Sequence, residues 1–340
     1  MTLPRAVHAT APTRVDLAGG TLDIWPLAHM IDGPVVTLNM AIDILTEATV
    51  TPRDDASVVL TSLDREEVVA FPDRASIHHD HKLGLLSRLA DHFLPADGPG
   101  VDIVTRSDAP AGAGIAGSSA LNIALTAALS KYVGKPLKGN GLIDVAKDIE
   151  AALLRTPTGL QDYGAAVHGG LNCFAFPAGG MTRERLTDAE RLLPARLLLF
   201  YSGATRNSGI NNWEMFRRLI EKERRAVAGF ARIAEAAWIA AEALREGDMA
   251  TFDAAVAAEW KARRALFPAI STPVIDAAMT AAKRNGATAG RICGAGGGGC
   301  FFVLADPDRH AKLRGAVEKT GATFLPFVLS ETGVTSYNPR

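Results

Sequence analysis

A glycine-rich loop that leads into a helical stretch is the segment of this sequence best suited to bind phosphate. It runs Pro110-Ala-Gly-Ala-Gly-Ile-Ala-Gly-Ser-Ser119 and is followed by Ala- and Leu-rich residues. Glycines let successive backbone N–H groups turn toward one point, and a helix N-terminus adds partial positive charge. The hydroxyls of Ser118 and Ser119 can donate to phosphate or ligate Mg2+. The loop therefore predicts an anion-binding cradle.

Two familiar phosphate-binding patterns nearly match this loop. Its glycines satisfy GxGxxG, but that fingerprint should follow a strand directly and precede an acidic residue at the end of the next strand. Here Arg106–Pro110 intervene, and the acidic residues downstream lie on an expected helix. The spacing from Gly112 to Ser119 also fits GxxxxGK[ST], except that Ser118 replaces the lysine. The loop is thus a cradle of another kind, or a simple glycine turn that feeds a helix.

Two further segments combine glycines with groups that suit phosphoryl chemistry. Near the N-terminus, Arg14-Val-Asp-Leu-Ala-Gly-Gly-Thr-Leu-Asp23 brings a cation and two carboxylates beside adjacent glycines. Near the C-terminus, Gly294-Ala-Gly-Gly-Gly-Gly-Cys300 leads directly into strand-forming residues. Four successive glycines before a strand indicate close approach of the backbone to a ligand or to another loop.

The elements that must position these segments are a mixture of strands and helices. Residues 10–70 are β-rich, with apolar runs at Val35–Met40 and Ile44–Val50 bounded by turn residues. Helical spacing predicts long helices over Trp213–Glu246 and Met249–Phe267. Because the order lacks regular βαβ alternation, the fold class is expected to be α+β. Other expected strands are Val101–Thr105, Leu197–Tyr201, Cys300–Leu304 and Phe324–Leu329, and other expected helices are 83–94, Ala120–Val133, Leu142–Leu154, Val274–Arg284 and Arg309–Thr320.

The composition excludes several classes of partner. The 340 residues are 48% hydrophobic and carry a net charge of −1, which gives no electrostatic reason to expect nucleic acid or an anionic membrane. The most apolar stretch, Ala228–Leu244, contains three charged residues and is not expected to span a bilayer. Three cysteines without a CxxC pair, and no signal-peptide pattern at the start, fit a cytoplasmic location.

With its three glycine-bearing segments in this order, the sequence resembles the GHMP kinases. The segment Leu17–Asp23 is similar to LAGGxxD, and Gly112–Ala120 is similar to GxGLGGSSA, as in the sugar-kinase branch that includes D-glycero-D-manno-heptose 7-phosphate kinases. The resemblance spans nearly the whole chain. It implies a two-domain α+β fold, with a ribosomal protein S5 domain 2-like part at residues 1–190 that carries the ATP-binding loop, and a ferredoxin-like part at residues 191–340.

The same resemblance implies roles for individual residues, with ATP and Mg2+ as cofactors. Asp162, in Gly-Leu-Gln-Asp, matches the catalytic aspartate that deprotonates the acceptor hydroxyl, and Arg14 would offset charge on the phosphoryl group. Glu150 and Ser119 match the ligands of Mg2+. Expected to bind the nucleotide are Pro110, Gly112, Ala113, Gly114, Ile115, Ala116, Gly117, Ser118 and Ser119, and expected to bind the acceptor are Gly19, Gly20, Asp23, Arg206, Asn207, Gly296 and Gly297.

The sequence departs from the family pattern at two places. Ala116 stands where the middle motif usually has glycine, and Thr21-Leu22 replaces the common Gly-Thr before Asp23. The second change leaves the acceptor open. Neither change removes a group that phosphoryl transfer needs.

The expected activity is transfer of the γ-phosphate of ATP to a hydroxyl of a sugar or sugar phosphate, perhaps the anomeric one in a heptose 7-phosphate. Other GHMP activities stay open, namely galactokinase, fucokinase, homoserine kinase and mevalonate-type kinases, as does a regulator that senses sugar and ATP without turnover. A nicotinamide-dependent enzyme is a third alternative. The expected partner is a small molecule, and a homo-oligomer is left open.

Overall fold

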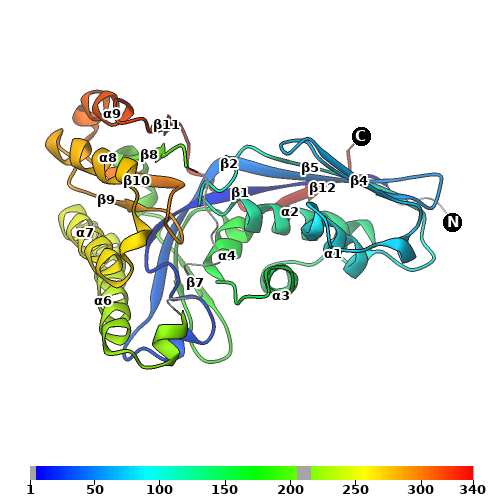
Figure 1. Ribbon diagram of the computed structural model, residues 1–340, viewed down its shortest axis with the longest axis horizontal. Coiled ribbons are helices and arrows are strands. Elements are labelled where there is room, and N and C mark those ends of the chain that lie inside the picture. The colour runs from blue at the N-terminus through cyan, green and yellow to red at the C-terminus, as the bar shows by residue number, and fades with distance from the viewer. Residues whose placement is uncertain (1–4, 205–215, 340) are drawn as a thin grey trace.

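Two β-sheets set side by side, each covered by helices, form the framework of the protein (Figure 1). The computed structural model describes residues 5–204 and 216–339. Helices and sheets are not interleaved as in a doubly wound protein, so the predicted α+β class is confirmed.

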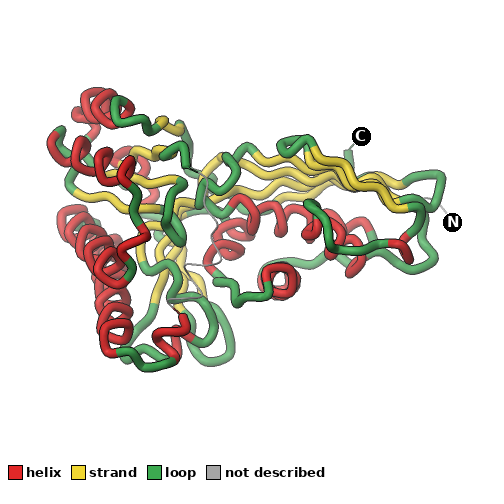
Figure 2. Tube along the Cα trace, viewed as in Figure 1, coloured by secondary structure: helices red, strands yellow, loops and turns green. Residues whose placement is uncertain are grey.

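The first sheet is built on a long antiparallel pair, β1 (Val7–Ala18) and β2 (Val36–Pro52). Its strand order is β12-β1-β2-β5-β3-β4, and β6 pairs with the first part of β2 and with β7. Because β2 exchanges partners along its length, the same strand reaches from one end of the molecule to the other (Figure 2). The remaining strands are β3 (Val58–Ser62), β4 (Glu67–Phe71), β5 (Val101–Ser107), β6 (Leu171–Ala175), β7 (Thr182–Arg185) and β12 (Thr335–Tyr337).

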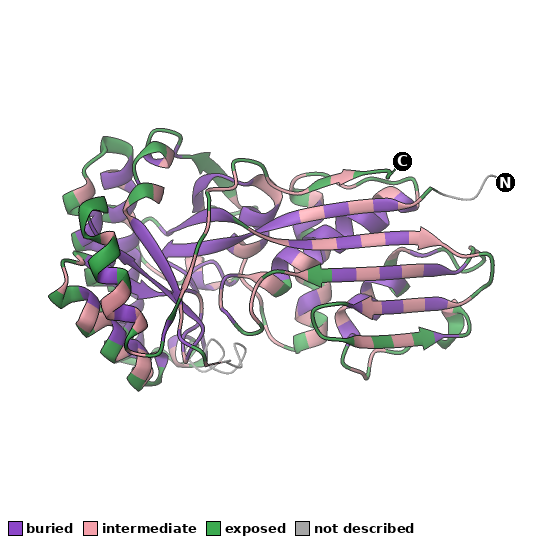
Figure 3. Ribbon diagram, turned by 90° about the horizontal axis from the view of Figure 1, so that it is seen from above, coloured by how far each residue is buried: buried purple, intermediate pink, exposed green. Residues whose placement is uncertain are grey.

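Helices pack on one face of this sheet. Along β3 and β5, buried residues alternate with partly exposed ones, the pattern of strands with one face against a core and the other against solvent (Figure 3). The central helix α2 (Gly117–Tyr132) is buried along most of its length and contacts both β1 and β2. Around it lie α1 (Gly84–Phe93), α3 (Asn140–Leu154) and α4 (Gln161–His168).

The second sheet has four antiparallel strands in the order β11-β8-β10-β9. In chain order, a strand, helices, two strands, a helix and a strand give the arrangement of a ferredoxin-like domain. The elements are β8 (Leu197–Tyr201), α6 (Arg224–Glu246), α7 (Met249–Leu266), α8 (Pro273–Arg284), β9 (Ala289–Ile292), β10 (Cys300–Leu304), α9 (His310–Glu318) and β11 (Thr323–Leu325). Short 3-10 turns occupy Leu27–His29, Arg74–Ser76, Ala189–Arg191, Pro194–Arg196, Pro268–Ile270 and Pro307–Arg309.

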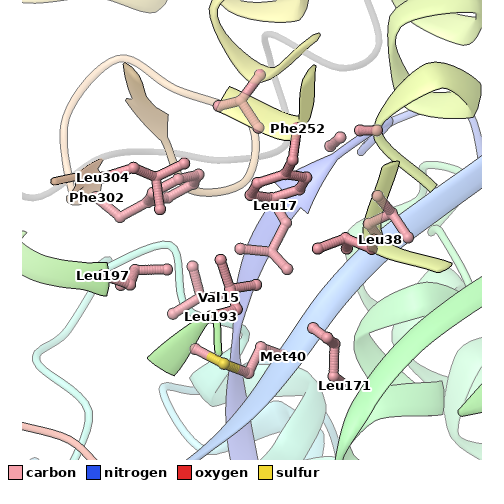
Figure 4. Close-up of a cluster of buried hydrophobic side chains, with 14 of the residues drawn as sticks. Val15, Leu17, Leu38, Met40, Leu171, Leu193, Leu197, Phe252, Phe302 and Leu304 are labelled. Atoms are coloured by element: carbon pink, nitrogen blue, oxygen red, sulfur yellow. The ribbon is translucent and has the colours of Figure 1, made fainter. Parts of the chain in front are cut away.

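One hydrophobic core joins the two sheets. Val15 and Leu38 from the first sheet, Phe252 from α7 and Phe302 from β10 belong to a single buried cluster (Figure 4). Shared apolar burial resists sliding of one part on the other, so side chains from both parts can be held in one site. The division at residues 190 and 191 stays a prediction. β12, close to the C-terminus, pairs with β1 of the first sheet.

Two predicted elements are wrong in their extent. The apolar runs at Val35–Met40 and Ile44–Val50 are one continuous strand, because both pair along β1. The single helix predicted over Trp213–Glu246 is interrupted: residues 216–220 are helical, and α6 begins only at Arg224. Lys222 has a left-handed φ of 55°, which ends the first helical segment. The strand predicted at Phe324–Leu329 ends at Leu325.

Candidate active site

The glycine-rich loop leaves β5 and turns into the N-terminus of α2. Gly112, Gly114 and Ala116 all have left-handed φ values, of 67°, 77° and 63°. Two of these positions suit glycine, whereas Ala116 adopts the conformation at the cost of about 1 kcal/mol. Such a sequence of turns, followed by free N–H groups in the first turn of a 16-residue helix, is the geometry of an anion cradle.

Arg14 on β1 links this loop to Asp162 on α4. Its Nε and Nη2 donate to Asp162 Oδ1 at 2.8 and 2.7 Å, and its Nη1 donates to the carbonyl of Gly114 at 2.8 Å. The Arg14 side chain is 3% exposed and that of Asp162 is 29% exposed. The cation is therefore held by the protein, while the carboxylate still faces open space.

Glu150 on α3 accepts hydrogen bonds from three hydroxyl groups. Ser118 Oγ donates to Oε1 at 2.8 Å, Ser119 Oγ donates to Oε2 at 3.4 Å, and the Tyr163 hydroxyl also donates to Oε2. Burial raises the pKa of the Glu150 carboxyl, and these hydrogen bonds oppose that rise. One carboxylate and two serine hydroxyls at the mouth of the cradle form a set of hard oxygen ligands, which suits Mg2+ bound together with phosphate oxygens.

Asp23 lies in the loop after β1 and faces the start of α4. Its Oδ2 accepts a hydrogen bond from the backbone N–H of Gln161 at 2.9 Å, one residue before Asp162. Burial raises the pKa of Asp23 to about 6, and the nearby Asp162 charge adds to the effect. Gly159 makes this approach possible, because a Cβ there would lie 2.2 Å from Asp23 Oδ2.

These groups line one cavity of about 540 Å³. At one end are the loop 109–114 and the side chains of α2, and at the other are Asp16, Thr21, Asp23, Gln161 and Asp162. Arg14 lies on the wall that both ends share. The volume suits a small ligand or two bound in line.

The structure brings most of the proposed site residues together, but not all of them. Arg14, Asp23, Ser118, Ser119, Glu150 and Asp162 line the cavity, as do Pro110, Gly112, Ala113, Gly114, Ala116 and Gly117. Ile115 is fully buried in the core beneath the loop. The backbone of Gly19 packs on Val36, and Gly20 lies against Asp16 and Gln161, behind the lining. Arg206 and Asn207 fall outside the described residues.

The glycine run at residues 296–299 supports the loop more than it lines the cavity. Gly294 and Ala295 are lining residues, whereas Gly296 and Gly297 pack on Ile270. A Cβ on Gly299 would lie 2.6 Å from the carbonyl oxygen of Ala113, and the Cys300 N–H donates to that same oxygen at 2.6 Å. The run therefore allows the second sheet to press directly on the cradle.

Sequence reasoning missed a buried group of charges behind the acceptor end. Arg291 on β9 donates to Asp16 Oδ2 at 2.8 Å and to Glu259 Oε1 at 2.7 Å. Arg263, one turn after Glu259 on α7, also donates to Glu259 Oε1, at 2.8 Å. The i, i+4 spacing of Glu259 and Arg263 was visible, but such pairs usually lie on solvated faces. Tyr163 was missed too, because nothing near it in the sequence points to Glu150.

Comparisons with known proteins follow the same two-part division. The family described as GHMP kinases N terminal domain matches residues 84–170, and that described as GHMP kinases C terminal matches residues 240–323. Together the two matches cover half of the chain. The chain belongs to the GHMP kinases. The resemblance inferred from the motifs, the two-domain fold and the small-molecule kinase activity are thereby confirmed. GHMP kinases use ATP, so ATP is the phosphoryl donor.

Individual relatives of this GHMP kinase share its full length. It is 25% identical to D-glycero-alpha-D-manno-heptose 7-phosphate kinase of Campylobacter jejuni over 98% of this chain and 99% of that protein. The structure of a D-glycero-D-manno-heptose 1-phosphate kinase from Bacteroides thetaiotaomicron superimposes with a TM-score of 0.79 at 21% identity, covering 98% and 99% of the two chains. Lactococcus lactis galactokinase complexed with galactose has a TM-score of 0.79 at 17% identity, covering 97% and 95%. These two structural likenesses establish the fold.

Within residues 5–204 and 216–339, no helix of this GHMP kinase is both long and apolar enough to cross a membrane. The same residues contain no group of three or more His, Cys, Asp or Glu side chains that would hold a metal ion by themselves. A divalent cation in the cavity would thus share its coordination with the phosphates of ATP.

Proposed function

We propose that this kinase transfers the γ-phosphate of ATP, with Mg2+, to a hydroxyl group of a sugar phosphate of the heptose 7-phosphate class. The observation that carries the proposal is the contact of Arg14 with both Asp162 and the carbonyl of Gly114. This contact joins a carboxylate suited to be a base to a loop suited to hold a triphosphate. The likeness to the Campylobacter jejuni heptose 7-phosphate kinase over nearly all of both chains supports this class of acceptor.

Asp162 acts as the general base. Its carboxylate accepts the proton of the acceptor hydroxyl as the hydroxyl oxygen attacks the γ-phosphorus and the bond to the leaving ADP oxygen breaks. The bidentate contact with Arg14 holds the carboxylate in one orientation. Arg14 also lies close enough to the cradle to offset negative charge on the transferring phosphoryl group.

The cradle and the oxygen ligands bind the donor. Amide groups at the start of α2 would hold the phosphates, since they lie at a helix N-terminus and have no partners within the helix. Glu150, Ser118 and Ser119 would hold Mg2+. The cation would neutralise charge between the β- and γ-phosphates. Tyr163 would keep Glu150 turned toward the two serines.

Carboxylates at the acceptor end favour a ligand rich in hydroxyl groups. Asp16, Asp23 and Asp162 all line this end, and ionised carboxylates only accept hydrogen bonds. Hydroxyl groups of a sugar can donate to them, whereas a phosphate group would be repelled. The phosphate already present on the acceptor would therefore lie away from these residues, where Arg206 and Asn207 stay predicted contacts.

The proposal is tested by measuring ADP release from purified enzyme with ATP, Mg2+ and one acceptor at a time. The panel is D-glycero-D-manno-heptose 7-phosphate, galactose, fucose, glucuronate and mevalonate. We expect the highest kcat/KM with the heptose 7-phosphate, and a product with one more phosphate by mass spectrometry. Preference for mevalonate, or saturable sugar and ATP binding without ADP release, would overturn it in favour of another GHMP activity or a sensor.

A further inference from the structure

The loop that carries Asp23 has a backbone that needs outside support. It leaves β1 at Gly19, whose φ is 79°, and continues through Thr21, whose φ is 81°. Glycine adopts this region readily, but a β-branched residue does not, and a strained residue of this kind persists only where its surroundings hold it. We call residues 19–23 the acceptor loop.

Two side chains of α7 supply that support. Arg263 donates through Nη2 to the carbonyl of Gly20 and through Nη1 to Thr21 Oγ1 at 3.3 Å. Glu259 Oε1 accepts a hydrogen bond from the N–H of Gly19 at 3.3 Å. Three consecutive residues of the loop are thus held by one ion pair, whose members contact each other at 2.8 Å.

The pair is rigid because it is buried and compensated. The side chains of Arg263 and Glu259 are 1% and 0% exposed. Arg291 adds a second cation and Asp16 a second carboxylate, so two positive and two negative groups share one interior space. Buried ion pairs add little net stability, but they fix geometry, because each charge is costly to leave without its partner.

We infer that Glu259 and Arg263 are positioning residues for the acceptor, a role that rests on the proposed function. They touch neither nucleotide nor phosphate cradle. They act through the acceptor loop, which ends at Asp23, and Asp23 in turn receives the N–H of Gln161 beside Asp162. The pair on α7 therefore sets where a sugar hydroxyl meets the base, although it lies in the other half of the molecule.

Arg263→Lys is the sharpest variant, because lysine keeps the charge beside Glu259 but cannot reach Gly20 and Thr21 as a planar fork. Arg264→Lys is its matched control, since the next residue of α7 is half-exposed and pairs with Asp276 at 3.2 Å. With the panel acceptor that the wild type uses best, we expect a rise of at least about tenfold in KM for the acceptor in Arg263→Lys. The KM for ATP should be unchanged, and Arg264→Lys should match the wild type.

Hydrogen exchange of the acceptor loop gives a readout that needs no acceptor. The amides of Leu22 and Ile24, which donate to Gly19 and Thr21, should exchange faster in Arg263→Lys and not in Arg264→Lys. Thr21→Val, which deletes one acceptor of Arg263 and leaves α7 intact, should shift in the same direction and serves if Arg263→Lys does not fold. Unchanged exchange in a folded variant, or equal rises in both KM values, would overturn the inference. A wild type that phosphorylates no acceptor would instead overturn the proposed function.

Discussion

Arg14 and Asp162 are 148 positions apart in sequence, yet two nitrogens of one guanidinium donate to a single carboxylate oxygen at 2.8 and 2.7 Å. The third nitrogen of that group reaches the carbonyl of Gly114 in the phosphate cradle. One side chain thus couples the direction of the base to the position of the loop. The following predictions test this site part by part.

Replacing Asp162 with asparagine should remove the base and keep its shape. We expect kcat to fall by about 10²- to 10⁴-fold, the usual contribution of a general base. The affinity for ATP, measured by calorimetry, should stay within about twofold, because asparagine can still accept from Arg14. Asp148→Asn, on the exposed side of α3, is the matched control and should behave as wild type. Near-normal turnover in Asp162→Asn would remove this residue from the mechanism.

Glu150→Gln should weaken the response to Mg2+. Glutamine keeps the size of the side chain and an oxygen for Ser118, but it loses the negative charge that a divalent cation needs. Titration of ATP binding at increasing Mg2+ should show a midpoint at least about tenfold higher than in wild type. Glu246→Gln, on an exposed turn at the end of α6, is the control. Equal midpoints in the two variants would exclude Glu150 as a metal ligand.

Asp23 should make both stability and acceptor binding depend on pH. Its pKa is raised from 3.8 to about 6, so the folded protein holds this proton more tightly than the unfolded chain. Stability from this group is therefore greatest below pH 4 and falls as pH rises toward 6, by about 3 kcal/mol in total. Asp23→Asn cannot ionise, so its free energy of unfolding relative to wild type should increase between pH 4 and pH 7.

The same titration should appear in the kinetics of the wild type. A step near pH 6 in the KM for the acceptor is expected, because only the ionised carboxylate accepts hydrogen bonds from hydroxyl groups through both oxygens. Urea unfolding of wild type and Asp23→Asn across this pH range measures the first effect, and initial rates measure the second. Parallel stability profiles in the two proteins would show that Asp23 ionises normally.

Gly299→Ala should damage the cradle from behind. Its new Cβ would lie 2.6 Å from the Ala113 oxygen, and its φ of 78° is strained for alanine. Gly247→Ala separates these two causes, since Gly247 has a φ of 72° with no atom within 4 Å of the new Cβ. Both variants should lose about 1–2 kcal/mol of stability from strain. Only Gly299→Ala should raise the KM for ATP; a similar rise in Gly247→Ala would assign the effect to general destabilisation.

The phosphate cradle was predictable because its geometry is local. Glycines at residues 112, 114 and 117, followed by serines and a helix-forming stretch, constrain their own backbone whatever the rest of the chain does. The strands at 197–201 and 300–304 were likewise predicted with the bounds that the structure has, since continuous apolar runs between turn residues identify buried strands. Where local signals were absent, as at the helix break near Lys222, the prediction was wrong.

The sequence by itself determined the family, the fold class and which backbone segment can hold phosphate. Only the tertiary structure decided which side chains meet: Arg14 with Asp162, Tyr163 with Glu150, and Arg263 with the acceptor loop. Backbone conformation depends mainly on neighbouring residues, whereas these pairings depend on how two sheets and their helices pack around a shared core. That packing is a sum of many distant contacts, which no short stretch of sequence records.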